Sequence, residues 1–141
     1  MVRVVRLVTI ADVREDVDAR RISVSARHEA VLEDGSRVLL LDDRGWTEEL
    51  RGAGATGIDN LWALTPEHDI VETTRVVVGP DEPYGGRTQD DMETDHWNAL
   101  AETLRRHGVA ADAGGLRQLP HDVVLSDRLL SRLGRGPGNA A

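Results

Sequence analysis

The sequence has no cysteine, no lysine and no phenylalanine. Without cysteine there can be no disulfide and no thiolate metal ligand. Without phenylalanine, and with only three tryptophans and one tyrosine, the core must be built from valine, leucine, isoleucine and alanine. All 17 basic residues are arginines. We interpret that bias as the mark of a high-GC bacterial genome.

Long apolar runs and an excess of positive charge are also missing. No segment approaches the ~20 apolar residues that a membrane-spanning helix needs. The apolar start, MVRVVRLVTI, continues as a strand pattern and has no signal-peptide cleavage site. The formal net charge of −8 argues against nucleic acid or an anionic membrane as a partner. We therefore expect a small acidic protein located in the cytoplasm.

The length of 141 residues predicts one domain that buries roughly two-thirds of the surface of the unfolded chain. We expect this single domain to span residues 1–134. The end of the sequence, RGPGNAA at residues 135–141, offers nothing to bury and is predicted to be disordered.

The first part of the chain has the pattern of antiparallel strands. Val2–Ile10 carries β-branched residues on both faces, which is typical of a strand inside a sheet. Asp34-Gly35 predicts a hairpin turn that leads into a strand over Arg37–Asp42. Ile58–Leu64 is a candidate fourth strand. The clearest alternation lies before the hairpin turn and places one set of side chains on a single face: Ile22, Val24, Ala26, His28, Ala30 and Leu32.

The later part of the chain has helical patterns, the clearest of which runs from Thr88 to Val109. Thr88 is a good N-cap and Asp91 completes a capping box, while Gly108 is a good left-handed C-cap. One face of this helix is mainly apolar and carries Met92, His96, Trp97, Leu100 and Leu104.

Three further segments are predicted to be helical. Thr65-Pro66 opens one helix, which Gly79-Pro80 ends. Thr47 is a possible N-cap for a single helical turn, and Asp112 is a possible N-cap for a short helix. Pro120 is predicted to begin a last helix that continues through Val123 and Val124 to Leu133. The predicted fold class is α+β, in which an antiparallel meander of three to four strands packs against three helices.

The negative charge is concentrated between Asp81 and Asp95, where six acids and one arginine give a net charge of −5. Such runs are usually solvated surfaces, but they can also steer a basic partner. We define the acidic patch as Asp81, Glu82, Tyr84, Asp90, Asp91 and Asp95.

His28 is an unusual residue because it lies on the apolar face of its strand. A buried imidazole needs a partner for its nitrogens, so a structural hydrogen bond is the ordinary explanation. The alternative is a pocket between sheet and helix, lined by His28, Glu93, His96 and Trp97. Glu93 and His96 also have the Glu-x-x-His spacing of di-iron bundles, but no second such pair exists. We expect no metal, cofactor or catalytic residue.

Two functions therefore remain open. The first is a non-enzymatic module that binds a basic protein through the acidic patch, as an immunity protein, an antitoxin or a regulator would. The second is a small enzyme or ligand sensor that uses the histidines of the alternative pocket.

Overall fold

The computed structural model describes residues 2–14, 20–49 and 61–134 and has the predicted α+β class. The predicted disordered tail at 135–141 lies outside these residues. A four-stranded sheet has the order β3-β2-β1-β4. Its strands are β1 (Val4–Val13), β2 (Arg21–Leu32), β3 (Arg37–Glu49) and β4 (His121–Leu125). The first three strands form the predicted antiparallel meander.

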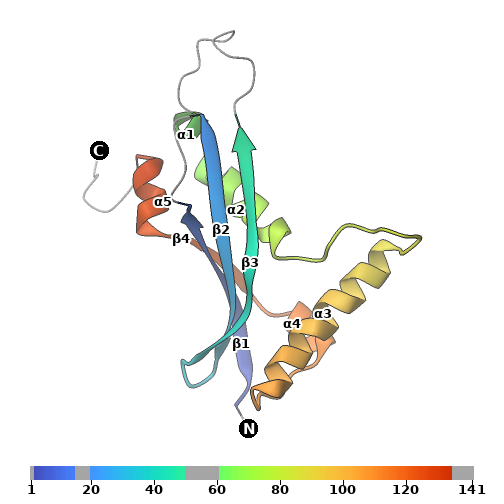
Figure 1. Cartoon of the computed structure of the whole chain (residues 1–141). Helices are drawn as coiled ribbons and strands as arrows, with labels where there is room; N and C mark the ends of the chain where they lie inside the picture. The colour runs from blue at the N-terminus through green and yellow to red at the C-terminus, as the bar shows by residue number, and fades with distance from the viewer. Residues whose placement is uncertain (1, 15–19, 50–60, 135–141) are drawn as a thin grey trace.

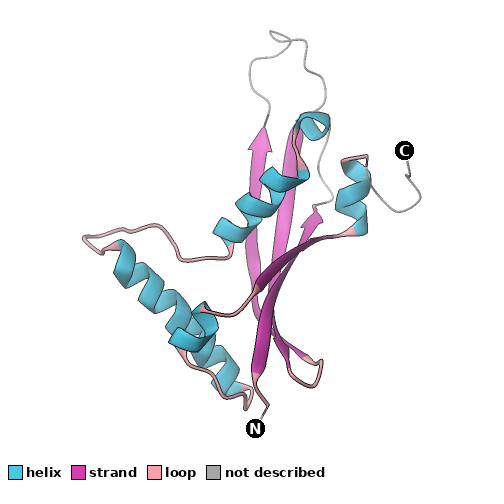
Figure 2. Cartoon of the chain, turned by 180° about the vertical axis from the view of Figure 1, so that it is seen from behind, coloured by secondary structure: helices cyan, strands magenta, loops and turns pink. Residues whose placement is uncertain are grey.

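The helices cover one face of this sheet and leave the other face bare (Figures 1 and 2). They are α1 (Leu61–Leu64), α2 (Glu67–Val77), α3 (Gln89–Arg106), α4 (Ala113–Arg117) and α5 (Asp127–Arg132). Two apolar clusters lie beneath them. The first joins Leu7, Ala30, Leu32, Val38, Leu40, Leu100, Ala101, Leu104, Val109 and Leu116. The second joins Ala11, Val13, Ile22, Val24, Leu61, Trp62, Ile70 and Leu129.

The helix α3 has the boundaries that its sequence predicts. Thr88 accepts a hydrogen bond from Asp91 N, and Asp91 accepts one from Thr88 N, which completes the capping box. Gly108 has a φ of 78°, the left-handed conformation expected after a helix. Leu100 and Leu104 are 2% and 0% exposed, so the apolar face was identified correctly.

The segment after Pro120 is not helical, as the sequence had suggested, but forms β4. This strand runs parallel to β1, and Leu7 N donates to Pro120 O at 2.8 Å. The sheet is therefore mixed, and its fourth strand comes from the end of the chain. A short apolar run fits a helix and a strand equally well, and only pairing with β1 decides between them. The helical part, α5, begins after Ser126, whose hydroxyl accepts from Leu129 N.

Two other short segments were predicted wrongly. Leu61–Leu64 forms the helical turn α1 and not a fourth strand, because Trp62 is buried there and its Nε1 donates to Arg21 O. Residues 58–60 lie outside the described part of the chain. Thr47 does not cap a helical turn but continues β3, where its hydroxyl lies 3.1 Å from that of Ser23.

A buried charge on α3 tests whether this helix holds the fold together. Leu100→Asp places a carboxylate in the first apolar cluster, and we expect a loss of several kcal/mol in unfolding free energy. Ala99→Asp, on the exposed side of the same helix, is the matched control and should melt near the wild type. An unchanged melting temperature for the Leu100 variant would show that the buried face of α3 has been assigned wrongly.

Candidate functional site

A row of polar side chains crosses the helix-covered face of the sheet between the two apolar clusters. Thr9 of β1 and His28 of β2 are cross-strand partners and are 0% and 2% exposed. His121 of β4 is paired with Leu7, two residues from Thr9, and so lies on the same face. We call Thr9, His28 and His121 the histidine row.

The Thr9 hydroxyl joins the two imidazoles of the row. Its Oγ1 lies 2.7 Å from Nδ1 of His28 and 2.7 Å from Nε2 of His121. The two rings meet edge to face, with centroids 5.0 Å apart and an angle of 71° between their planes. Thr9 has no third side-chain partner among the described residues, so its single proton must serve one of the two imidazoles.

This sharing restricts the two tautomers. A hydroxyl donates one hydrogen bond, and the other ring must then donate to the oxygen. If His28 donates through Nδ1, His121 accepts at Nε2 and carries its own proton on Nδ1. If His121 donates through Nε2, His28 accepts at Nδ1 and carries its proton on Nε2. The two neutral rings therefore either both carry their proton on Nδ1 or both carry it on Nε2.

Burial keeps both rings of the row neutral at pH 7. Desolvation, followed by the nearby His121, His96 and Arg44, lowers the pKa of His28 to about 3. Desolvation and the guanidinium of Arg75 lower the pKa of His121 to about 4, although Asp122 acts in the opposite direction. The row is therefore a neutral network and not an ion pair.

Sequence reasoning found His28 but missed its partners. His121 and Asp122 fell within the helix that was predicted to begin at Pro120, and Thr9 fell within the predicted strand Val2–Ile10. The signal that was available is the pair of β-branched valines after Asp122, which favours a strand and would place His121 in the sheet. The structural explanation of His28, a hydrogen bond, agrees with this geometry.

The residues of the alternative pocket are divided between two places. His96 on α3 is near enough to His28 to lower its pKa, and its own pKa is lowered by burial and by Arg44. Trp97 meets the ring of His96 edge to face with centroids 5.0 Å apart. Glu93 instead pairs with Arg117 at 2.9 Å. Glu93 and Trp97 border a hollow of about 130 Å³ between α3 and α4.

Three larger surface hollows lie away from the two histidines His28 and His96. One of about 590 Å³ lies beside Arg3, Leu116 and Leu119, and one of about 400 Å³ lies beside Trp46 and Leu64. One of about 340 Å³ is bordered by Ile10, Asp12, Ser25, Ala26, Arg27 and Asp42. Neither histidine lines any of the three, so these hollows give the pocket hypothesis no support.

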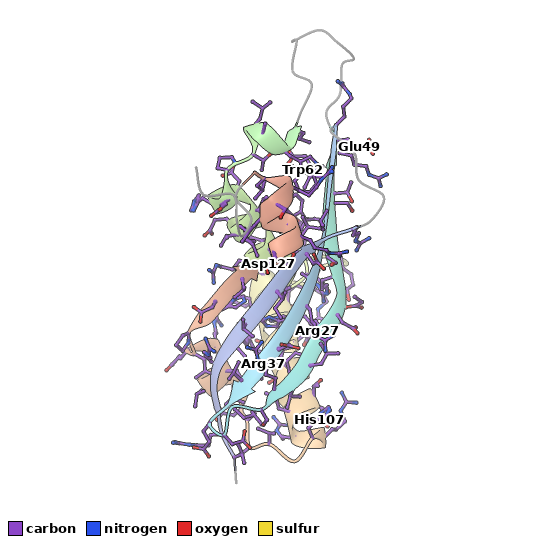
Figure 3. All side chains as sticks on the ribbon, turned by 90° about the vertical axis from the view of Figure 1, so that its left-hand side faces the viewer. Arg27, Arg37, Glu49, Trp62, His107 and Asp127 are labelled. Carbon is purple, nitrogen blue, oxygen red and sulfur yellow. The ribbon has the colours of Figure 1, made fainter. Side chains whose placement is uncertain are left out.

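The bare face of the sheet carries charged side chains that pair with each other. Glu29 accepts from Nε of Arg27 at 2.8 Å and from a terminal nitrogen of Arg37 at 3.1 Å (both arginines are labelled in Figure 3). Asp12 accepts from Ser126 and Arg128, which ties the start of α5 to β1. These contacts explain the charges of this face as part of the fold.

The acidic patch lies on the loop between α2 and α3 and on the first turns of α3. All six of its residues are exposed, and Tyr84 is 64% exposed. Figure 1 shows this loop standing away from the sheet at the upper end of α3. The patch is thus a protruding surface that another molecule can reach.

Some of its carboxylates have partners within the chain. Asp81 pairs with Arg44 at 3.0 Å, Asp95 pairs with Arg87, and Asp91 completes the capping box. Within the described part of the chain, Glu82 and Asp90 have no ion-pair partner. These two acids therefore carry the charge that is least compensated.

Comparisons with known proteins do not assign the chain to a family. No protein-family model, curated protein or solved structure matches it. In residues 2–14, 20–49 and 61–134, no group of three or more His, Asp or Glu side chains is arranged to hold a metal ion. In the same residues, no helix is both long and apolar enough to cross a membrane.

Removal of the Thr9 hydroxyl tests the histidine row. Thr9→Val keeps the shape of the side chain but leaves His28 Nδ1 and His121 Nε2 without their shared partner. We expect the free energy of unfolding to fall by about 1–3 kcal/mol. Thr73→Val, on the exposed side of α2, is the matched control. Equal stability of the two variants in denaturant titrations would contradict the shared hydrogen bond.

Acid should destabilise the protein before its carboxylates are protonated. The pKa values of His28 and His121 lie below the usual 6.5, so the unfolded chain binds protons that the folded chain does not. The free energy of unfolding is therefore unaffected by these two rings above pH 6.5 and falls as the pH is lowered towards 4. Because one pKa unit corresponds to about 1.4 kcal/mol, each ring should lower the free energy of unfolding by about 2–3 kcal/mol at pH 4.5.

Denaturant titrations between pH 7 and 4.5 measure this loss. His121→Gln should flatten the dependence on pH, whereas His107→Gln, at an exposed position, should keep the slope of the wild type. A wild-type stability that stays constant over this range would show that the two rings are not buried as neutral groups.

Proposed function

We propose that the protein is a non-enzymatic binding module that presents its acidic patch to a basic protein partner. An immunity protein, an antitoxin or a regulator would work in this way. The observation that carries the proposal is the exposure of the patch together with the two acids, Glu82 and Asp90, that no arginine of the described residues neutralises. The setting that we propose is the bacterial cytoplasm.

The loop that carries the patch has a defined shape, which supports recognition. Arg87 N donates to Tyr84 O at 3.0 Å, and the two residues between them, Gly85 and Gly86, have φ values of 57° and 80°. Positive φ at both central positions is the mark of a type I′ turn. The capping box at Thr88 then fixes the entry into α3. A loop that is already ordered loses less conformational entropy when it binds.

The ion pairs within the patch do not remove it as a binding surface. Asp81 is 64% exposed and the side chain of Asp95 is 56% exposed, and exposed ion pairs contribute little to stability. A partner with several arginines or lysines can therefore exchange these contacts at small cost. Tyr84, which is also exposed beside the acids, adds apolar area and a hydroxyl for such a contact.

Charge reversal at the two uncompensated acids tests the proposal. Glu82→Arg with Asp90→Arg should leave the melting temperature close to that of the wild type. Loss of the acid in the first turn of α3 costs only about 0.3–1 kcal/mol. A partner captured by pull-down at low salt should bind the double variant at least tenfold more weakly, mainly through slower association.

A control with the same change in net charge separates the patch from a general effect of charge. Glu48→Arg with Glu72→Arg changes two exposed acids that border the hollow beside α1 and α2. This control should bind the partner with nearly the wild-type affinity. Equal binding by both double variants, or binding that does not weaken with salt, would rule out the patch.

A further inference from the structure

The two imidazoles of the histidine row each have one nitrogen left over. Nδ1 of His28 and Nε2 of His121 are used by Thr9. Within the described part of the chain, Nε2 of His28 and Nδ1 of His121 have no hydrogen-bond partner. His28 is only 2% exposed, so an open nitrogen on this side chain requires an explanation.

The open nitrogen of His28 is not sealed inside the protein. Among the described residues, Nε of Arg21 is the side-chain nitrogen or oxygen that is fully buried and makes no hydrogen bond, although it lies 3.6 Å from a carboxylate oxygen of Glu49. Nε2 of His28 therefore keeps a small contact with the solvent. A polar atom of this kind, deep in the sheet but still accessible, can hydrogen-bond to a small solute.

The pairing of the strands is irregular at the same position. The register between β2 and β3 shifts between Ala26 and His28 and again between His28 and Glu29. Bulges of this kind change the direction of a side chain and are over-represented next to functional sites. In both shifts the extra residue lies in β3, so the irregular part of β3 faces His28.

Two arginines lie near the row, and one of them, Arg44, is paired with Asp81 at 3.0 Å and with Asp43 at 3.8 Å. Arg44 of β3 lowers the pKa of both His28 and His96, and Arg75 of α2 lowers the pKa of His121. Arg75 reaches the row directly, because one of its terminal nitrogens donates to the carbonyl oxygen of His121 at 2.7 Å. Arg44 donates to Val77 O at 3.3 Å.

Two acids lie near this site, and both are paired with arginines. Asp81 raises the pKa of His96 but pairs with Arg44 at 3.0 Å. Asp122 raises that of His121 but pairs with Arg6 at 3.2 Å. Arg75 has no ion-pair partner among the described residues, so its charge is the one that remains to attract an anion beside the row.

We propose that His28 and His121, with His96, Arg44 and Arg75 around them, bind the single carboxylate or phosphate group of a small anionic ligand. The two rings are 5.0 Å apart, so one group with several oxygens can contact both. The hydrogen bonds to Thr9 hold each ring in place and leave the other nitrogen for the ligand. This site meets the acidic patch only at the ion pair between Arg44 and Asp81, and neither proposed binding function requires the other.

The Thr9 bridge also links this binding to a proton. In both tautomer arrangements of the neutral row, one open nitrogen carries a proton and the other does not. When one further proton is bound, both open nitrogens become donors while both bonds to Thr9 are kept. An anion therefore favours the protonated row, and its binding should take up one proton.

Titration with sulfate tests the site, because the charge of sulfate stays constant between pH 5 and 7. The histidine ring signals of the protein are followed by NMR at constant ionic strength. The signals of His28 and His121 should shift in a saturable way, whereas those of His68 and His107 should not. The affinity should rise as the pH falls, up to about tenfold per pH unit.

Parallel titrations with inorganic phosphate and with acetate distinguish a phosphate ligand from a carboxylate ligand, and saturable binding of either supports the site. Arg75→Gln should weaken sulfate binding at least tenfold, and Arg106→Gln, on the exposed part of α3, should not change it. The proposal is overturned if no saturable shift occurs in the wild type, if His107 shifts as much as His28, or if the affinity does not depend on pH.

Discussion

The hydroxyl of Thr9 is the contact on which the arrangement of the sheet depends. Three strands contribute one polar side chain each at the same level, and a buried polar group without a partner is costly. The single hydroxyl satisfies two imidazoles, one from β2 and one from β4. It therefore joins the meander at the start of the chain to a strand that comes 112 residues later.

The same contact separates the two halves of the core. On one side of the row, α3 and α4 pack on the sheet, and on the other side α1, α2 and α5 do so. A core without aromatic residues other than tryptophan has few large side chains with which to fill the middle of a long sheet. Polar groups that bond to each other occupy this position instead, and they leave two nitrogens that the fold does not use.

Local signals in the sequence predicted most of the fold. The Asp34-Gly35 turn and the Thr88–Asp91 capping box need only residues that are close in the chain, and both are present. The strand β4 could not be predicted in this way, because a five-residue apolar run takes its conformation from its partner β1. For the same reason the sequence identified His28 as unusual but could not show that Thr9 and His121 are its partners.

The acidic patch was easier to find than to interpret. Composition alone locates the concentration of negative charge between Asp81 and Asp95, but not the arginines that approach it. Arg44 comes from β3 and pairs with Asp81 across 37 residues, which no local pattern reveals. The structure thereby reduces the six acids of the segment to a smaller set, Glu82 and Asp90, that is available for a partner.

The protonation of the two rings at pH 7 tests the central claim, that one hydroxyl is shared between two neutral imidazoles. Nitrogen chemical shifts of labelled histidine distinguish the two neutral tautomers and the imidazolium. We predict that His28 and His121 are both neutral and carry their protons on the nitrogen of the same name, Nδ1 in both or Nε2 in both. Opposite tautomers in the two rings, or an imidazolium in either at pH 7, would contradict the account.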